Sequence, residues 1–166
     1  MYDFLIRFAA DGLVIVIVII ALVMLFAKTP ARDRYDRYTR VFMAGISSYL
    51  LAKFAGSVWQ PASQRPFEQL GIDPGAAYLN NPGFPSDHAL LAFFLVFAVW
   101  YATRNRAMTI VLLVLAVVMC AGRVLALVHT PLDIAGSFVI AAIAALWYTG
   151  YGKNQSRKTI AKRAKK

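Results

Sequence analysis

The side chains best suited to chemistry lie in one short segment between two apolar runs. Arg123, His129 and Asp133 place a strong cation, an imidazole and a carboxylate close together there. Thr130 and Pro131 predict a helix start, because threonine is a favoured N-cap and proline suits the first helical position. Helix starts favour anions, and a guanidinium can donate two parallel hydrogen bonds to phosphate. The segment therefore indicates phosphate chemistry.

A second helix start carries the other histidine of the chain. Ser86 has the residue type of an N-cap, and His88 would lie in the first turn of that helix. A lone histidine at a membrane interface is usually an anchoring or hydrogen-bonding residue. Here, however, both histidines lie at helix starts and near arginines. We therefore expect the two imidazoles, His88 and His129, to form with Arg65 and Arg123 one pocket for a group with two negative charges.

The composition predicts a membrane protein. The 166 residues are 60% hydrophobic, with a mean hydropathy of +0.58 and a formal net charge of +10. The charges are confined to short segments between apolar runs, and no basic surface interleaved with aromatic residues is present, so nucleic acid is not an expected partner. The single cysteine, Cys120, lies in an apolar run and excludes an intrachain disulfide.

Five apolar segments predict an all-α, polytopic transmembrane helical bundle of about five spans. They are residues 4–27, 41–59, 89–102, 107–128 and 131–151. The first lacks the positively charged start of a signal peptide and is interpreted as a retained span. The third reaches across a membrane only if its helix begins near Ser86. Within the first span, Arg7 and Asp11 are one helical turn apart and are expected to pair.

The basic residues predict the orientation. Most lysines and arginines lie in residues 28–40, 103–107 and 152–166, which five spans would place on one side. Short basic segments are typical of the cytoplasmic side. We therefore expect a single membrane-embedded domain, residues 1–152, in the plasma membrane, with a cytoplasmic basic tail at 153–166. Both histidines would then face the outside of the cell.

Three motifs together resemble the signature of the type 2 phosphatidic acid phosphatase superfamily. That family includes membrane lipid phosphatases and, in soluble form, vanadium haloperoxidases. The resemblance covers about 70 residues and lies in three blocks: Arg65-Pro66, Pro85-Ser86-Asp87-His88, and Arg123-x5-His129-x3-Asp133. It implies a helical bundle that hydrolyses a phosphate ester or diphosphate through a phosphohistidine.

The resemblance assigns a role to each motif residue. It implies that His129 is the nucleophile, that Asp133 holds its imidazole in the right tautomer, and that His88 protonates the departing oxygen. No metal or cofactor is implied, since cations and helix ends stabilise the charge. The non-bridging oxygens would be bound by one residue of each motif: Arg65, Ser86 and Arg123.

The chain departs from the family pattern at three positions. Val58 stands where the family has a lysine; Lys53 could replace that lysine by reaching outward along the helix, or could merely reach the interface. Gly122 stands where a serine is usual. Asp87 replaces a glycine, and its carboxylate would repel a phosphate dianion unless it faces solvent or a cation. Lys53 and Asp87 are therefore further candidates for the phosphate-binding wall.

The Pro-Ser-Asp-His form is similar to that of bacterial undecaprenyl-diphosphate phosphatases of the bacitracin-resistance type. This resemblance favours undecaprenyl diphosphate as substrate, with membrane lipids as surroundings. The alternatives within the enzyme class are phosphatidylglycerophosphate, phosphatidate and a lipid A phosphate. Two alternatives of another class are a non-catalytic protein that binds or transports lipid phosphates, and an interaction subunit held by its basic tail. The oligomeric state stays open.

Overall fold

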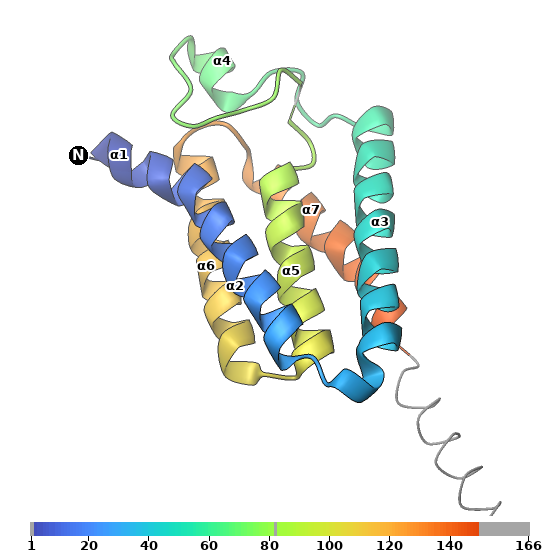
Figure 1. The fold of residues 1–166 in the computed structure, drawn as a ribbon. Helices are drawn as coiled ribbons and strands as arrows, with labels where there is room; N and C mark the ends of the chain where they lie inside the picture. Colours follow the sequence, from blue (N-terminus) through green and yellow to red (C-terminus); the bar gives the residue numbers. More distant parts are fainter. Residues whose placement is uncertain (1, 82, 150–166) are drawn as a thin grey trace, which may run out of the picture.

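The structure is a computed structural model that describes residues 2–81 and 83–149, and its regular elements there are helices (Figure 1). The all-α prediction is thereby confirmed. The elements are α1 (Tyr2–Arg7), a π-helical turn η1 (Phe8–Gly12), α2 (Leu13–Lys28), a 3-10 turn η2 (Ala31–Asp33), α3 (Arg34–Val58), α4 (Pro66–Leu70), α5 (Asp87–Thr103), α6 (Arg106–Leu125), α7 (Pro131–Ala144) and a 3-10 turn η3 (Ala145–Tyr148).

Four segments of the described chain are long and apolar enough to cross a membrane. They are Phe4–Lys28, Ala31–Val58, Arg106–Leu125 and Pro131–Tyr148. Helix α5 is also apolar but has only 17 residues. It begins at Asp87, directly after Ser86, as the prediction of a fifth span required. The chain is therefore a multi-pass bundle of about five spans.

Helix α3 begins seven residues earlier than predicted, at Arg34 instead of residue 41. Two basic residues that were expected in a loop, Arg37 and Arg40, belong to its first turns and bind the ends of other helices. Arg37 Nη1 donates to the carbonyl oxygen of Ala102 at 2.7 Å, and Arg40 Nη1 donates to that of Trp147 at 2.7 Å. Cations at the carbonyl ends of helices satisfy unpaired acceptors and interact favourably with the helix dipole. These interactions explain why α3 extends back to Arg34.

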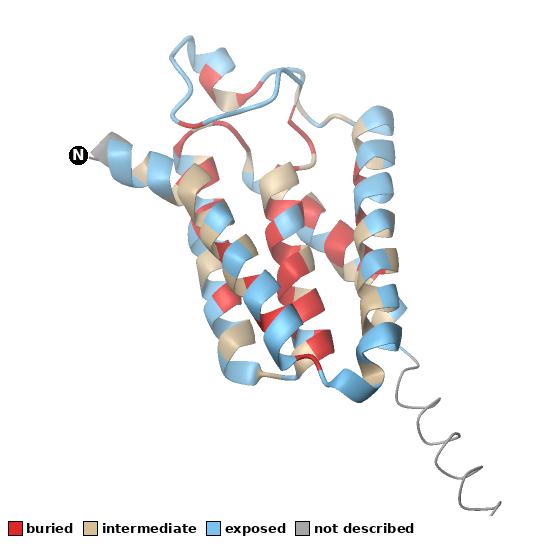
Figure 2. Cartoon of the chain, in the orientation of Figure 1, coloured by how far each residue is buried: buried red, intermediate tan, exposed pale blue. Residues whose placement is uncertain are grey.

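Helix α5 is the centre of the bundle and packs against α2, α3, α6 and α7. Its alanines let neighbouring helices approach closely; Ala89, Ala92, Ala98 and Ala102 are fully buried. Many residues of α2 and α3 are exposed (Figure 2), and large apolar side chains such as Ile19, Phe26 and Phe54 are among them. Such a surface suits lipid, because acyl chains solvate apolar groups without cost.

The two ends of the bundle differ in character (Figure 1). The α2–α3 and α5–α6 connections lie at one end and carry basic residues of segments 28–40 and 103–107. The long segment 59–86 and the α6–α7 connection lie at the other end, with the candidate site. The predicted basic tail, residues 153–166, falls outside the described residues.

Candidate active site

His129 directly follows a tight turn that is held in place by the long segment 59–86, called the outer loop below. Leu127 in this turn adopts a left-handed backbone, with φ of 58°, which is uncommon for a residue other than glycine. Two loop amides donate to the turn: Phe67 N–H to the carbonyl of Leu127 and Gly75 N–H to that of Ala126, both at 3.1 Å. His129 is consequently fixed at its backbone and only 4% exposed.

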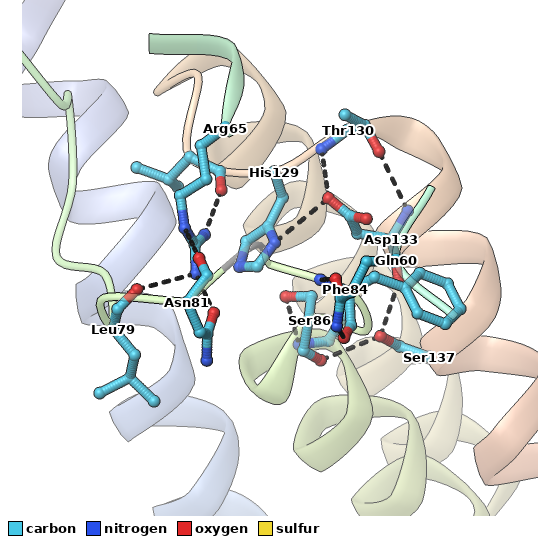
Figure 3. A network of polar contacts seen from close by, with 12 residues as sticks. Gln60, Arg65, Leu79, Asn81, Phe84, Ser86, His129, Thr130, Asp133 and Ser137 are labelled. Carbon is cyan, nitrogen blue, oxygen red and sulfur yellow. Dashed lines mark hydrogen bonds and ion pairs between the residues drawn. The ribbon is translucent and has the colours of Figure 1, made fainter. Parts of the chain in front are cut away.

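The first turn of α7 orients the His129 ring (Figure 3). Thr130 is the N-cap, as predicted, and its Oγ1 accepts from the Asp133 amide at 3.2 Å. Asp133 Oδ2 accepts from the Thr130 amide at 2.7 Å and lies 3.5 Å from His129 Nδ1. One carboxylate therefore holds both the helix start and the imidazole. It faces Nδ1 of His129, so Nε2 is the ring nitrogen left to react.

Burial lowers the pKa of His129 from its ordinary value of 6.5, while the neighbouring Asp133 carboxylate acts in the opposite direction. The two nearby guanidinium groups, Arg123 and Arg65, lower this pKa further. A lowered pKa means that the ring stays neutral at pH 7. A neutral imidazole has the free electron pair that a nucleophile needs.

This lowered pKa predicts where activity falls in acid. Protonation of His129 would remove the free electron pair of its imidazole, so the acid limb of kcat/KM, which reports ionisations of the free enzyme, should have an apparent pKa below 6.5. The pH profile should be measured with two esters whose phosphates ionise at different pH. A limb shared by both esters belongs to the enzyme; a shared limb above 6.5 would contradict the prediction.

The start of α5 is locked to the start of α7. Ser86 is the predicted N-cap, and its Oγ accepts from the Ala89 amide at 3.4 Å. Ser137 Oγ lies 2.7 Å from the carbonyl oxygen of Asp133 and 2.9 Å from that of Ser86. The Ser86 amide also donates to the Asp133 carbonyl at 3.4 Å. Ser137 was missed by the sequence analysis, although a serine one turn after Asp133 in an apolar run was the available signal.

Phe84 lies near the end of the long loop and packs between helices α3 and α7. The side-chain amide of Gln60 binds both backbone groups of Phe84: it donates to the carbonyl at 3.1 Å and accepts from the N–H at 3.3 Å. Two glycines admit this close approach. A Cβ at Gly56 would lie 2.7 Å from the Phe84 carbonyl oxygen, and one at Gly136 would lie 2.3 Å from the ring. Trp59 packs edge-on against the same ring at 4.8 Å. These contacts fix the chain just before Ser86.

Arg65 is 3% exposed and holds the outer loop to the His129 turn. Four of its five N–H groups are engaged: with the carbonyls of Asn81 at 3.0 Å and Leu79 at 3.1 Å, with Asn81 Oδ1 at 2.7 Å, and with the carbonyl of Val128. One N–H of Nη1 remains for an anion. Arg65 therefore mainly holds the loop in place, whereas its sequence motif predicted that it would bind phosphate oxygens.

Arg123 is 1% exposed and forms an ion pair that the sequence analysis did not predict. Its Nη1 donates to Asp11 Oδ1 at 2.7 Å. The expected pairing of Asp11 with Arg7 is wrong, because the π-helical turn η1 directs Asp11 toward α6 instead. A buried guanidinium without its carboxylate would cost about 3–5 kcal/mol, so this partner matters for stability as well as for position.

Lys53 and Asp87 form an ion pair at the rim of the site. Lys53 Nζ lies 3.2 Å from Asp87 Oδ1 and 5.3 Å from the centre of the Tyr49 ring. Both side chains are partly exposed, so the pair itself contributes little stability. Asp87 thus faces a cation, which is one of the two surroundings expected for a carboxylate at this position.

One cavity of about 260 Å³ collects most of the predicted residues. Arg65, Asp87, His88, Arg123 and His129 line it, together with the loop segment around Tyr78 and Asn81. Ser86, Lys53 and Asp133 are not among the lining residues: the first caps α5, the second lies at the rim, and the third lies behind His129. A cavity of about 780 Å³ near Arg40 and Trp147 lies apart from the histidines.

The described residues hold no group of three or more His, Cys, Asp or Glu side chains that could bind a metal ion. The cavity offers instead two imidazoles and two guanidinium groups beside a helix start. Such a set can bind the oxygens of a phosphate, attack its phosphorus and protonate a leaving group.

The fold and the cavity define a class of protein: multi-pass membrane proteins with a cavity lined by histidine and arginine side chains. The sequence profile of the PAP2 superfamily matches residues 12–157 of the chain. The chain belongs to the PAP2 superfamily, whose membership indicates a phosphoric ester hydrolase. Comparison with curated proteins and with solved structures found no match.

Proposed function

We propose that this protein is a lipid phosphatase that works through a phosphohistidine on the extracytoplasmic face of the plasma membrane. The observation that carries the proposal is the shared cavity of His88 and His129, with the Asp133 carboxylate 3.5 Å behind His129 Nδ1. The distribution of basic residues supports the orientation, because the cavity lies at the end of the bundle opposite the basic connections.

In the first step, Nε2 of His129 attacks phosphorus, and the bond from phosphorus to the leaving oxygen breaks. His88 gives that oxygen a proton. In the second step, water attacks the phosphohistidine while His88 takes a proton from the water. The phosphorus–nitrogen bond then breaks, releasing inorganic phosphate and free His129. Asp133 keeps the Nδ1 proton in place throughout.

The phosphate oxygens are held by Arg123 and by the free N–H of Arg65. Ser86 is the third residue that we propose for this role, through its hydroxyl proton, since its oxygen already accepts from Ala89. The amides at the start of α5 add a favourable dipole. Because these donors are fixed before the substrate arrives, they stabilise developing charge without reorganisation.

The finer proposal is that the substrate is undecaprenyl diphosphate, cleaved to the monophosphate. The Lys53–Asp87 pair supports it, because a diphosphate extends further than a monoester and would reach the rim, where Lys53 can bind the second phosphate. An apolar groove of about 630 Å³ between α2, α3 and α5 supports a long lipid chain. Tyr49 lines this groove and contacts Lys53, whose partner Asp87 lines the cavity.

A substrate panel tests this proposal on purified protein in detergent. Phosphate release should be highest with undecaprenyl diphosphate and lower with phosphatidylglycerophosphate, phosphatidate and a lipid A phosphate. Lys53→Met should lower kcat/KM for the diphosphate by about tenfold, as for loss of one charge-assisted contact of about 1.5 kcal/mol. A monophosphate should also turn over more slowly, because the Asp87 carboxylate loses its partner, but by less than the diphosphate, which loses the Lys53 contact as well.

The matched control is Lys28→Met, a lysine at the opposite end of the bundle, which should leave all rates near the wild-type level. A preference for any monophosphate lipid would refute the diphosphate assignment but not the phosphatase. Binding of these lipids with no phosphate release from any of them would favour the second candidate, a lipid-phosphate-binding or transport protein.

A further inference from the structure

Asp11 connects three separate parts of the chain at the active site. Its Oδ1 accepts from Arg123 Nη1 at 2.7 Å, and its Oδ2 accepts from the Ala77 amide at 2.9 Å. Arg123 comes from the end of α6, and Ala77 belongs to the outer loop; both residues line the cavity. Asp11 itself is only 25% exposed in its side chain. One carboxylate therefore links an arginine of the cavity lining to a loop segment that also lines the cavity.

The backbone of η1 reaches this position because residue 122 is a glycine. A Cβ on Gly122 would lie 2.8 Å from the amide nitrogen of Ala10 and 2.9 Å from the carbonyl carbon of Ala9. Both contacts are with backbone, which cannot move aside as a side chain can. The serine that is usual before Arg123 therefore has no room here. Its absence and the presence of Asp11 are two parts of one arrangement.

The π-helical turn Phe8–Gly12 gives Asp11 its direction. In a regular α-helix Asp11 would share a face with Arg7, four residues earlier. The wider turn rotates Asp11 toward α6, and such turns often occur at functional sites. The profile match begins at residue 12, so it does not include Asp11.

We propose that Asp11 is a positioning residue of the active site, which holds Arg123 so that its remaining donors face the phosphate. The inference rests on the phosphatase function proposed above. Within the described residues, Arg123 lines the cavity and its buried Nε–H has no hydrogen-bond partner, while Asp11 fixes Nη1. Asp11 does not line the cavity and acts only through Arg123 and the Ala77 loop.

The first test compares Asp11→Asn with Asp73→Asn, which removes an exposed carboxylate from the same outer loop. Two quantities are measured: kcat/KM for a water-soluble phosphate ester, and the affinity for inorganic vanadate. Asp11→Asn should lower both by about 10- to 100-fold, since small misplacements of a catalytic group cost that much. Asp73→Asn should stay within about twofold of wild type. Asp11→Glu, which keeps the charge, should retain more activity than Asp11→Asn.

A double-mutant cycle separates positioning from a general effect on folding. In an Arg123→Gln background, Asp11→Asn should add a loss of no more than about threefold, because the partner is already gone. An undiminished loss in that background, or wild-type rates in Asp11→Asn alone, would overturn the proposal. Wild-type protein that neither binds vanadate nor releases phosphate would instead overturn the phosphatase function itself, and this inference with it.

Gly122→Ser provides a second variant in case Asp11→Asn folds poorly. It restores the serine of the family pattern, yet it should lower kcat/KM by about tenfold or more, because η1 must move away from α6 and take Asp11 with it. Thermal unfolding of each variant shows whether the protein stays folded. Gly122→Ser with unchanged or higher activity would contradict the inferred docking of η1.

Discussion

His129→Ala should reduce kcat by about 10⁴-fold or more, the loss expected when a nucleophile is removed and no neighbouring group can replace it. Steady-state phosphate release from purified protein measures this loss. The cavity retains Arg123 and Arg65 in the variant, so inorganic vanadate or phosphate should still bind, although more weakly.

The control for this variant is Gln64→Ala, which truncates an exposed side chain of the outer loop and should keep wild-type turnover. His129→Ala with turnover within about tenfold of wild type and normal thermal unfolding would show that another residue is the nucleophile.

His88→Ala should give a loss that depends on the leaving group. A general acid contributes about 10²–10⁴-fold when the departing oxygen is a poor leaving group such as an alkoxide. For p-nitrophenyl phosphate, whose leaving group departs without a proton, the first step should slow much less. The second step would still lack its base, so phosphohistidine should accumulate in this variant.

Rapid-quench measurements on an alkyl phosphate and on the nitrophenyl ester separate these two steps. Equal losses of the first step on both esters would contradict the role of His88 as acid. Such a result would indicate that His88 binds phosphate instead.

Local signals explain why the two helix starts were predictable. Ser86 and Thr130 cap α5 and α7 by accepting hydrogen bonds from amides three residues later. Such caps can be recognised from the types of a few neighbouring residues. The short third span likewise required a start near Ser86, and α5 begins at Asp87. The capping pattern also brought Asp133 beside His129. Interactions within one turn of a helix depend little on the rest of the fold.

The partners of the charged residues were less predictable because they depend on approach between distant segments. Asp11 meets Arg123 only because Gly122 lets η1 pack backbone to backbone on α6. Most of the donors of Arg65 bind the outer loop, whose path no periodicity specifies. Lys53 extends toward the site as one alternative expected, but its partner Asp87 could be identified only once α3 and α5 were side by side.

We expect His129 to carry the phosphoryl group during turnover. The direct measurement is to quench the His88→Ala variant during reaction with a ³²P-labelled activated ester and to map the label by peptide mass spectrometry. His88→Ala should carry one acid-labile, base-stable phosphohistidine at position 129, and this label should be absent from His129→Ala. A label on any other residue, or turnover of the labelled ester by His88→Ala with no covalent adduct, would contradict the assignment of His129 as nucleophile.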